Sequence, residues 1–281
     1  MGTLTPEKAE GQYTRYVYKH NGNSYRYIHV FRTKAGQTIA PGLSMSAKDL
    51  AEINPASSSP TKVIAKINGG MFDVKGSQFY GFFYQGANYP MYVDGKSYSR
   101  VSEIPDSAGI FTSSKYWPSF CVKKDGTATI RWFANKSKLS AALPYCNCVI
   151  GSAHPMVYNG VSVLKVRQTD YDGVLICNPS NLNDANARFN GTLINPNEKT
   201  FRTLLGHTHG SNGIYVMVCA GSNMTLSVAA DLMVDLGCEV AVNLDGGTST
   251  QMRIKTGYGP AGKVTPNYAR DVFNAVCAVL K

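Results

Sequence analysis

The sequence has few acidic residues. Eighteen Asp and Glu residues stand against 28 Lys and Arg, which gives a formal net charge of +10. A chain of this charge is expected to meet an anionic partner, such as nucleic acid, a phosphate-containing glycan or an anionic cell wall. The basic residues are scattered and form no Lys/Arg-rich block, which disfavours a dedicated nucleic-acid groove. We therefore expect an anionic glycan or wall polymer as the partner, and no nucleic acid.

Long hydrophobic runs are also missing. No apolar stretch reaches the roughly 18 to 20 residues that span a bilayer, so we expect no membrane partner. The N-terminal segment MGTLTPEKAEGQYTRY lacks the apolar centre of a signal peptide, so no signal peptide is visible in this sequence. The sequence contains no glycine-rich loop that ends in Gly-Lys-Ser/Thr, which disfavours a nucleotide hydrolase.

Seven cysteines cannot all pair within one chain. Cys177, Cys219 and Cys277 lie inside apolar, strand-like runs, and we expect them to be small buried hydrophobic residues. Cys146 and Cys148 form a C-x-C pair, but no second Cys or His pair follows at the spacing of a zinc site. This usage favours a reducing cytoplasm, with a secreted or virion-associated location left open.

Histidines offer one weak metal motif. His207 and His209 form an H-x-H pair that would be half of a metal site if both side chains pointed to one side of a strand. Both lie among Gly, Ser and Asn residues at the tip of an expected hairpin, which favours a solvated turn. We expect no metal and no cofactor.

What the chain does contain is a series of hairpin signals. Asn21-Gly22, Asp94-Gly95 and Asp125-Gly126 each separate two alternating or aromatic runs, the pattern of antiparallel hairpins. Polar residues 1–15 predict a loose N-terminal arm, followed by a single domain over 16–281. A short helix is predicted over 46–54.

The most informative stretch runs over residues 224–251. Apolar residues at helical spacing follow Thr225, a suitable N-cap, and Gly237 is the expected stop. A strand of alternating pattern then ends on Asp245. Gly246, Gly247, Thr248 and Ser249 follow directly, so a carboxylate stands beside backbone amides and hydroxyl groups. Such a cradle suits chemistry at a phosphate or sugar phosphate, although Asp-Gly and Gly-Gly are also common turn pairs.

A second glycine turn has a similar form. The expected strand over 63–67 ends on Asn68, Gly69 and Gly70, so VIAKINGG parallels VAVNLDGG. Either the two turns face a shared pocket as parts of a pseudo-repeat, or the likeness is coincidental. Both interpretations remain open from the sequence.

Four motifs in order resemble the phosphodiester glycosidase family. They are NLDGG followed by hydroxyl residues, KINGGMFD over 66–73, FRTLLG over 201–206, and ARDVFNAVCAVL over 269–280. Together they extend from about Val63 to the C-terminus. The chain departs from the family pattern where Thr248 replaces a usual third glycine, and GSAHPMVYNG over 151–160 fits only loosely. The resemblance implies an α+β fold with a strand-rich mixed or antiparallel sheet core and a few packed helices.

The resemblance also implies an activity, namely hydrolysis of the sugar C1–O bond of a sugar 1-phosphodiester such as an N-acetylglucosamine phosphodiester. Asp245 is the expected carboxylate at the anomeric centre, with Asp73 as second carboxylate and His154 as a lesser acid/base candidate. Arg202 begins an apolar strand, and its planar fork suits phosphate oxygens. The other expected substrate or phosphate contacts are Thr203, Asn68, Gly69, Gly70, Gly246, Gly247, Thr248 and Ser249.

Two alternatives stay open. One is a non-catalytic module that binds anionic glycans or sugar phosphates in an inherited pocket, which the Thr248 departure would fit. The other is a phage-type depolymerase that applies the same chemistry to an anionic wall polymer.

Overall fold

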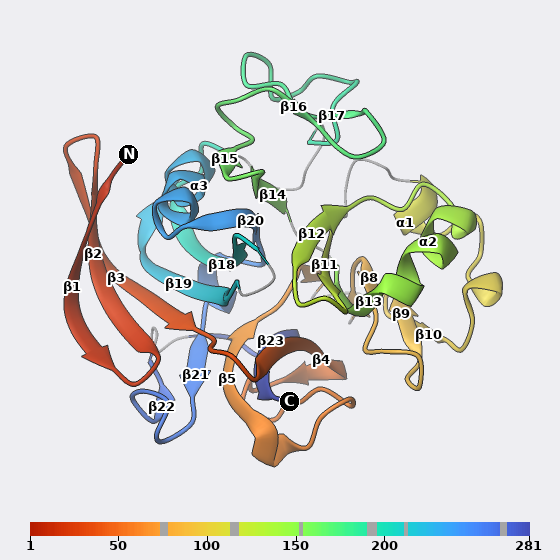
Figure 1. The fold of residues 1–281 in the computed structure, drawn as a ribbon, viewed down its shortest axis with the longest axis horizontal. Coiled ribbons are helices and arrows are strands. Elements are labelled where there is room, and N and C mark those ends of the chain that lie inside the picture. The colour runs from red at the N-terminus through yellow and green to blue at the C-terminus, as the bar shows by residue number, and fades with distance from the viewer. Residues whose placement is uncertain (74–77, 113–117, 152–153, 190–195, 211–212, 265–268) are drawn as a thin grey trace.

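Antiparallel strand pairing organises the protein (Figure 1). We analysed a computed structural model that describes all residues except 74–77, 113–117, 152–153, 190–195, 211–212 and 265–268. Every strand pair in this described part is antiparallel. The strand-rich α+β class expected from the sequence is confirmed.

The largest sheet has eight strands in the order β1-β2-β3-β19-β18-β20-β14-β15. Its strands are β1 Thr3–Glu10, β2 Tyr13–His20, β3 Asn23–Arg32, β19 Tyr215–Met224, β18 Thr200–Thr208, β20 Cys238–Asn243, β14 His154–Tyr158 and β15 Val161–Ser162. A second sheet has five strands in the order β22-β21-β5-β23-β4. These are β22 Gly262–Lys263, β21 Met252–Ile254, β5 Val63–Asn68, β23 Val272–Leu280 and β4 Gln37–Lys48.

Smaller sheets and short helices complete the fold. One three-stranded sheet contains β12 Ala128–Arg131, β11 Ser119–Lys123 and β13 Cys146–Ile150, and another contains β10 Lys96–Tyr98, β9 Met91–Val93 and β8 Phe82–Phe83. The two-stranded pairs are β16 Gln168–Thr169 with β17 Leu175–Cys177, and β6 Phe72–Asp73 with β7 Gln78–Phe79. The α-helices are α1 Gly109–Thr112, α2 Lys136–Ala142 and α3 Leu226–Asp235, and the 3₁₀ helices are η1 Pro60–Lys62, η2 Val101–Glu103, η3 Leu143–Tyr145 and η4 Gly247–Ser249.

The two faces of the eight-stranded sheet have different neighbours. Helix α3 packs against one face. The contact is so close that a Cβ at Gly206 would lie 2.7 Å from Met233 Cε. On the other face Thr203 reaches Asn68 of the five-stranded sheet. Because alternate residues of a strand point to opposite faces, β18 is buried between the helix and the second sheet.

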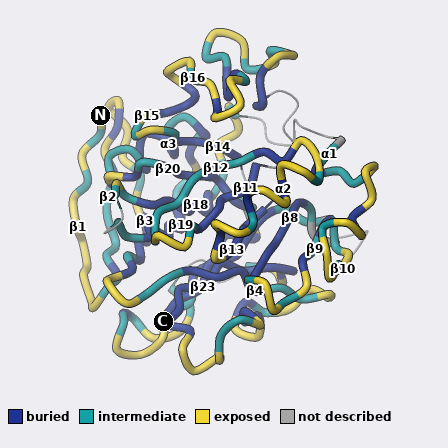
Figure 2. The backbone as a smooth tube through the Cα atoms, turned by 45° about the vertical axis from the view of Figure 1, so that its right-hand side comes forward, coloured by how far each residue is buried: buried dark blue, intermediate teal, exposed yellow. Residues whose placement is uncertain are grey.

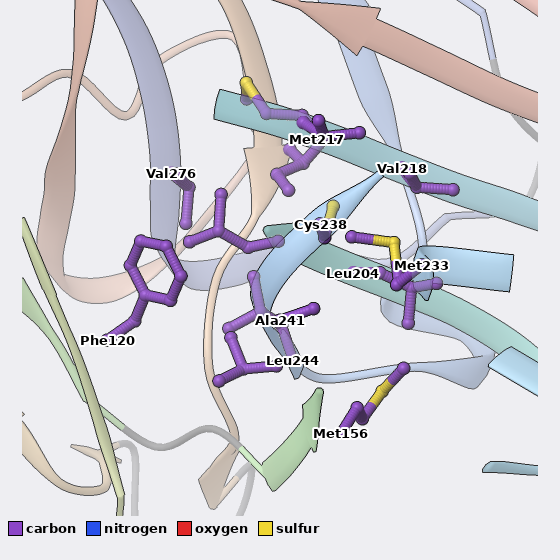
Figure 3. Packing of buried hydrophobic residues seen from close by; sticks show 14 of the residues in the cluster. Phe120, Met156, Leu204, Met217, Val218, Met233, Cys238, Ala241, Leu244 and Val276 are labelled. Carbon is purple, nitrogen blue, oxygen red and sulfur yellow. The ribbon is translucent and has the colours of Figure 1, made fainter. Parts of the chain in front are cut away.

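One hydrophobic core joins these layers (Figure 3). Phe120 of β11, Leu204 of β18, Met233 of α3, Ala241 of β20 and Val276 of β23 belong to it, although they come from three sheets and a helix. Figure 2 shows the buried central strands inside and exposed chain at the periphery. No helix of the described residues is long and apolar enough to cross a membrane.

Several local predictions are confirmed. The hairpin between β2 and β3 turns at Asn21 and Gly22, whose φ angles are 47° and 76°, as a tight two-residue turn requires. Helix α3 begins after Thr225, whose side chain accepts a hydrogen bond from the Val228 N–H at 3.4 Å, and Gly237 follows its end with φ +84°. All seven cysteines are buried and unpaired.

Two predictions are wrong. Residues 1–15 are not a loose arm, because β1 pairs with β2 at the edge of the large sheet and Gly2 N–H donates to Asp235 Oδ2 at 2.7 Å. Pro6 is acceptable there because an edge strand leaves some N–H positions unpaired. Residues 46–54 are not a helix, because Ser46 to Lys48 end β4, which pairs with β23.

Candidate active site

Asp245 lies two residues beyond the end of β20. The preceding Leu244 N–H donates to Thr203 O at 2.8 Å, which extends the pairing of β20 with β18 up to the turn. The structure explains why glycine follows Asp245 at two successive positions. A Cβ at Gly246 would lie 2.6 Å from Phe201 O, and Gly247 has φ +59°, a conformation that side chains disfavour. The turn continues into η4, so Gly246 and Gly247 hold Asp245 against β18.

The two glycine turns lie side by side. Asp245 N–H donates to Gly69 O at 3.0 Å, and Asn68 Nδ2 donates to Asp245 O at 2.8 Å. A Cβ at Gly69 would overlap Asn274 Oδ1, and Asn274 Nδ2 donates to Gly70 O at 3.1 Å. The turns therefore meet where the five-stranded and eight-stranded sheets touch. Among the described residues, the helix directly before β5 is the three-residue η1, so the helical half of the suggested repeat has no counterpart of α3 there.

The side chains of Asn68 and Thr203 form a hydrogen bond with each other. Thr203 Oγ1 donates to Asn68 Oδ1 at 2.8 Å, and the same oxygen accepts the Gln251 N–H at 3.1 Å. Asn68 is 1% exposed and Thr203 is fully buried. Their position gives them the role of a polar clamp between the sheets, which fixes the turns that flank Asp245.

The Asp245 carboxylate is mostly buried, with 16% of its side chain exposed. Desolvation raises its pKa above the ordinary value of 3.8, while hydrogen bonding from Ser249 and the nearby Arg270 charge oppose this. Burial disfavours the ionised form of a carboxyl group. Asp245 is thus a carboxylate whose ionisation depends on two neighbours.

Arg270 is the site residue that the sequence did not single out. Its Nη2 lies 3.2 Å from Asp245 Oδ2, and its Nε donates to Ser249 Oγ at 2.8 Å. The guanidinium carbon lies 4.7 Å from the centre of the Phe72 ring, a cation–π contact. The side chain remains 41% exposed. A signal existed, because Arg270 precedes the apolar run of β23 much as Arg202 begins that of β18.

Arg202 is placed differently from the expectation. The residue is 2% exposed, its Nε donates to Met224 O at 3.1 Å and its Nη2 to Glu198 O at 2.7 Å. Burial lowers its pKa. These contacts engage the guanidinium with backbone carbonyls before β18 and before α3, which argues against the expected contact with a phosphate.

His154 is also buried, at 1% exposure. It pairs across strands with Asn243, and among the residues that the structure describes neither of its ring nitrogens finds a hydrogen-bond partner. Desolvation, together with the Arg202 charge, lowers the His154 pKa to about 3. The His154 ring is therefore neutral at neutral pH. The nearby Arg202 charge acts on it, whereas the Arg270 charge acts on Asp245.

The remaining expected residues differ in accessibility. Thr248 is exposed, and its carbonyl accepts the Arg270 N–H at 3.0 Å, whereas Ser249 is fully buried. Asp73 belongs to β6, but its side chain lies outside the described part of the structure, so its role stays a prediction. A groove of about 490 Å³ borders Arg270 and is lined by Met45, Ser46, Ala47, Phe72, Arg270, Asp271 and Phe273.

The H-x-H pair does not converge. His207 is 1% exposed and packs on Tyr215, with ring centres 4.8 Å apart. His209 is solvent-exposed, and its Nδ1 lies 3.2 Å from Glu239 Oε1. Among the residues that the structure describes, no three His, Cys, Asp or Glu side chains gather in a way that could hold a metal ion.

Comparison with known proteins identifies the family. The family model described as phosphodiester glycosidase matches residues 61–279. The chain belongs to the phosphodiester glycosidase family. A search of the curated proteins finds no match.

Two solved structures are similar in fold to this phosphodiester glycosidase family member. One is the zebrafish N-acetylglucosamine-1-phosphodiester alpha-N-acetylglucosaminidase catalytic domain, auto-inhibited by its pro-peptide. It has 16% sequence identity and a TM-score of 0.56, and the match covers 100% of this chain and 82% of that one. The other is a hypothetical protein from Synechocystis, with 12% identity and a TM-score of 0.56, over 99% of this chain and 64% of that one. At these identities the likeness establishes the shared fold.

Proposed function

We propose that the protein is a glycosidase that hydrolyses the C1–O bond of a sugar 1-phosphodiester. Water adds to the anomeric carbon, the C1–O bond breaks, and the bridging oxygen leaves with the phosphate monoester. A phosphate monoester is a weaker base than an ordinary alkoxide, so this bond needs less acid assistance than a common glycoside. The main tasks are stabilising the positive charge that develops on the sugar and holding the leaving phosphate.

The observation that carries the proposal is the contact of Asp245 with Arg270 at the junction of the two glycine turns. Asp245 supplies a carboxylate for the anomeric centre, as nucleophile, base or electrostatic stabiliser. Arg270 is partly exposed and supplies a planar cation for phosphate oxygens. We assign to Arg270 the phosphate role first expected of Arg202, and the Gly246 and Gly247 amides remain proposed contacts.

The groove beside Arg270 supports a sugar-containing ligand. Phe72 and Phe273 belong to its lining, and their ring centres lie 5.1 Å apart. Phe72 is partly exposed, and Phe273 supports it from the buried side. Flat aromatic surfaces pack well against the apolar faces of sugar rings. In this arrangement the sugar or its aglycone lies along the groove and the phosphate lies at Arg270.

A non-catalytic binder is the second proposal, because Thr248 replaces the usual third glycine and is exposed at the turn. A Cβ and a hydroxyl at this position change what can approach the Arg270 guanidinium. A depolymerase of an anionic wall polymer would use the same chemistry as the first proposal on a longer substrate.

Incubation with a panel of sugar phosphodiesters, followed by NMR, separates these proposals. An enzyme should release free sugar and phosphate monoester in equal amounts. A binder should perturb the ligand signals while leaving the ligand intact over hours. Cleavage of polymeric members of the panel without cleavage of monomeric ones would favour the depolymerase.

A further inference from the structure

A second basic pocket lies away from Asp245, on the sheet formed by β12, β11 and β13. It has a volume of about 550 Å³ and is bordered by α2 and the chain around Tyr145. Among the side chains that the structure describes, none of the proposed active-site residues lines it. Its lining includes the basic residues Lys123, Lys124, Arg131 and Lys138.

The positive charge of this pocket is only partly balanced. Asp125 lies 3.4 Å from Lys123, and Asp172 lies 2.8 Å from Lys138. Within the described chain, no carboxylate comes within ion-pair distance of Lys124 or Arg131. Two cations in one pocket are therefore available to an anionic ligand.

Two exposed tyrosines stand at the same pocket. Tyr145 is 70% exposed and Tyr171 is 40% exposed. The Arg131 guanidinium carbon lies 4.3 Å from the Tyr171 ring centre, and Tyr171 OH donates to Trp132 O at 3.0 Å. These contacts hold the guanidinium over one face of the Tyr171 ring, so a positive charge and an exposed aromatic ring lie together in the pocket.

We propose that this pocket binds a phosphate-bearing segment of a glycan chain, as a second substrate-binding site. The inference rests on the proposed function for its class of ligand. Phosphate groups would pair with Lys124 and Arg131, while sugar rings would contact Tyr145 and Tyr171. A single-stranded nucleic acid needs a groove that follows its backbone over several nucleotides, whereas these residues form one confined pocket, so we favour the glycan.

A second site has a specific consequence for a polymeric substrate. A chain that is held at the pocket while another of its units lies at Asp245 gains apparent affinity, because the second contact becomes intramolecular. A monomeric sugar phosphodiester can occupy only one of the two places. The pocket should therefore affect oligomers and leave monomers unchanged.

The test measures binding of a fluorescently labelled sugar-1-phosphate oligomer by anisotropy, in an Asp245→Asn background. The pocket variant adds Lys124→Gln and Arg131→Gln. The matched control adds Lys19→Gln and Arg26→Gln, which remove one exposed Lys and one exposed Arg from β2 and β3. We expect the pocket variant to bind the oligomer roughly tenfold more weakly, because it loses two partly exposed ion pairs with phosphate. The affinity of the control should change less than about twofold.

Equal affinities of the two double variants, or absence of oligomer binding by Asp245→Asn itself, would overturn the inference. A single-stranded DNA of the same charge should bind more weakly than the oligomer. Tighter DNA binding that is lost in the pocket variant would instead assign the pocket to nucleic acid. The binding assay needs no turnover. If the wild-type protein failed to cleave sugar phosphodiesters, the proposed function would be refuted, but the binding comparison would still test the pocket.

Discussion

Burial and the neighbouring Arg270 act on Asp245 in opposite directions. Burial raises the pKa of the carboxyl group, and the Arg270 charge and the Ser249 hydrogen bond counteract it. A carboxyl group whose pKa is shifted by burial and by a neighbouring charge is typical of functional sites, because a catalytic group needs a pKa suited to its task. The Phe72 ring beneath the Arg270 guanidinium limits the orientations that this cation can take.

Replacing Arg270 with Gln should move the acid side of the pH–rate profile upward. In the proposed mechanism the ionised form of Asp245 is the active one, and the Arg270 charge lowers the Asp245 pKa. Removing this charge should therefore raise the pH at which activity appears. The acid limb of kcat/KM reports the pKa of the free enzyme. We expect Arg270→Lys, which keeps the charge, to shift the limb less. An unchanged limb in Arg270→Gln would show that another group controls it.

Stability should respond to pH in a defined direction through Asp245. Its folded pKa lies above the ordinary 3.8, so the folded state binds the proton more tightly and loses stability as pH rises through this range. Asp245→Asn lacks this loss. The stability of the variant relative to wild type should therefore be greater at about pH 7 than at about pH 3, as measured by urea denaturation. The opposite trend would mean that the Arg270 pairing outweighs burial.

Arg202 and Arg270 should behave differently when each is replaced by Lys. Arg270→Lys loses the planar fork, and a charge-assisted hydrogen bond of about 1.5 to 3 kcal/mol corresponds to a roughly ten- to 150-fold lower kcat/KM on phosphodiesters. On an aryl glycoside, which carries no phosphate, the kcat/KM of Arg270→Lys should fall little. Arg202→Lys should lower kcat/KM equally on both substrates and lower the melting temperature, because the Arg202 guanidinium of the wild type contacts backbone carbonyls. Steady-state kinetics and melting curves check both. A phosphodiester-specific loss in Arg202→Lys would restore its phosphate role.

At the scale of elements, the site depends on where β5 and β18 touch. Their polar clamp of Asn68 and Thr203 is buried between the sheets, and it fixes the glycine turns that flank Asp245. A buried hydrogen bond of this kind is costly to break, because the remaining polar group stays buried with neither a protein partner nor water to bond to. The clamp therefore belongs to the fold, although both residues were expected to contact substrate.

Thr203→Val tests the clamp. It keeps the shape of the side chain but removes the hydroxyl that bonds to Asn68 and lies 3.3 Å from Thr250 Oγ1. We expect a loss of about 1 to 2 kcal/mol in the free energy of unfolding, measured by urea denaturation. Thr203→Ser keeps the hydroxyl and serves as the control. If Thr203→Ser is destabilised more than Thr203→Val, the methyl contact rather than the hydrogen bond matters.

Elements with local signals could be predicted from the sequence, and elements defined by distant partners could not. Helix α3 and the Asn21-Gly22 hairpin follow from capping and turn residues. The segment over 46–54 favours a helix locally, but pairing of β4 with β23 overrides that preference. The candidate site divides in the same way. The glycine turns could be found from the sequence, whereas the contact of Arg270 with Asp245 depends on how two sheets meet.

At the scale of the whole molecule, Asp245 lies where two sheets share one hydrophobic core. Leu244 of the site turn, Ile67 of β5 and Val276 of β23 all belong to this core. A rigid base of this kind can hold a carboxylate in a desolvated position, as electrostatic stabilisation of a transition state requires. The net charge of +10 would attract an anionic substrate toward the molecule.

The most direct test of this account is release of sugar from a monomeric N-acetylglucosamine 1-phosphodiester, followed by NMR for wild type and Asp245→Asn side by side. Wild type should release N-acetylglucosamine and the phosphate monoester together. The variant should remain folded by circular dichroism and lose on the order of 100-fold or more in kcat, because the amide offers no negative charge to the transition state. Turnover by the folded variant at the wild-type rate would contradict the account.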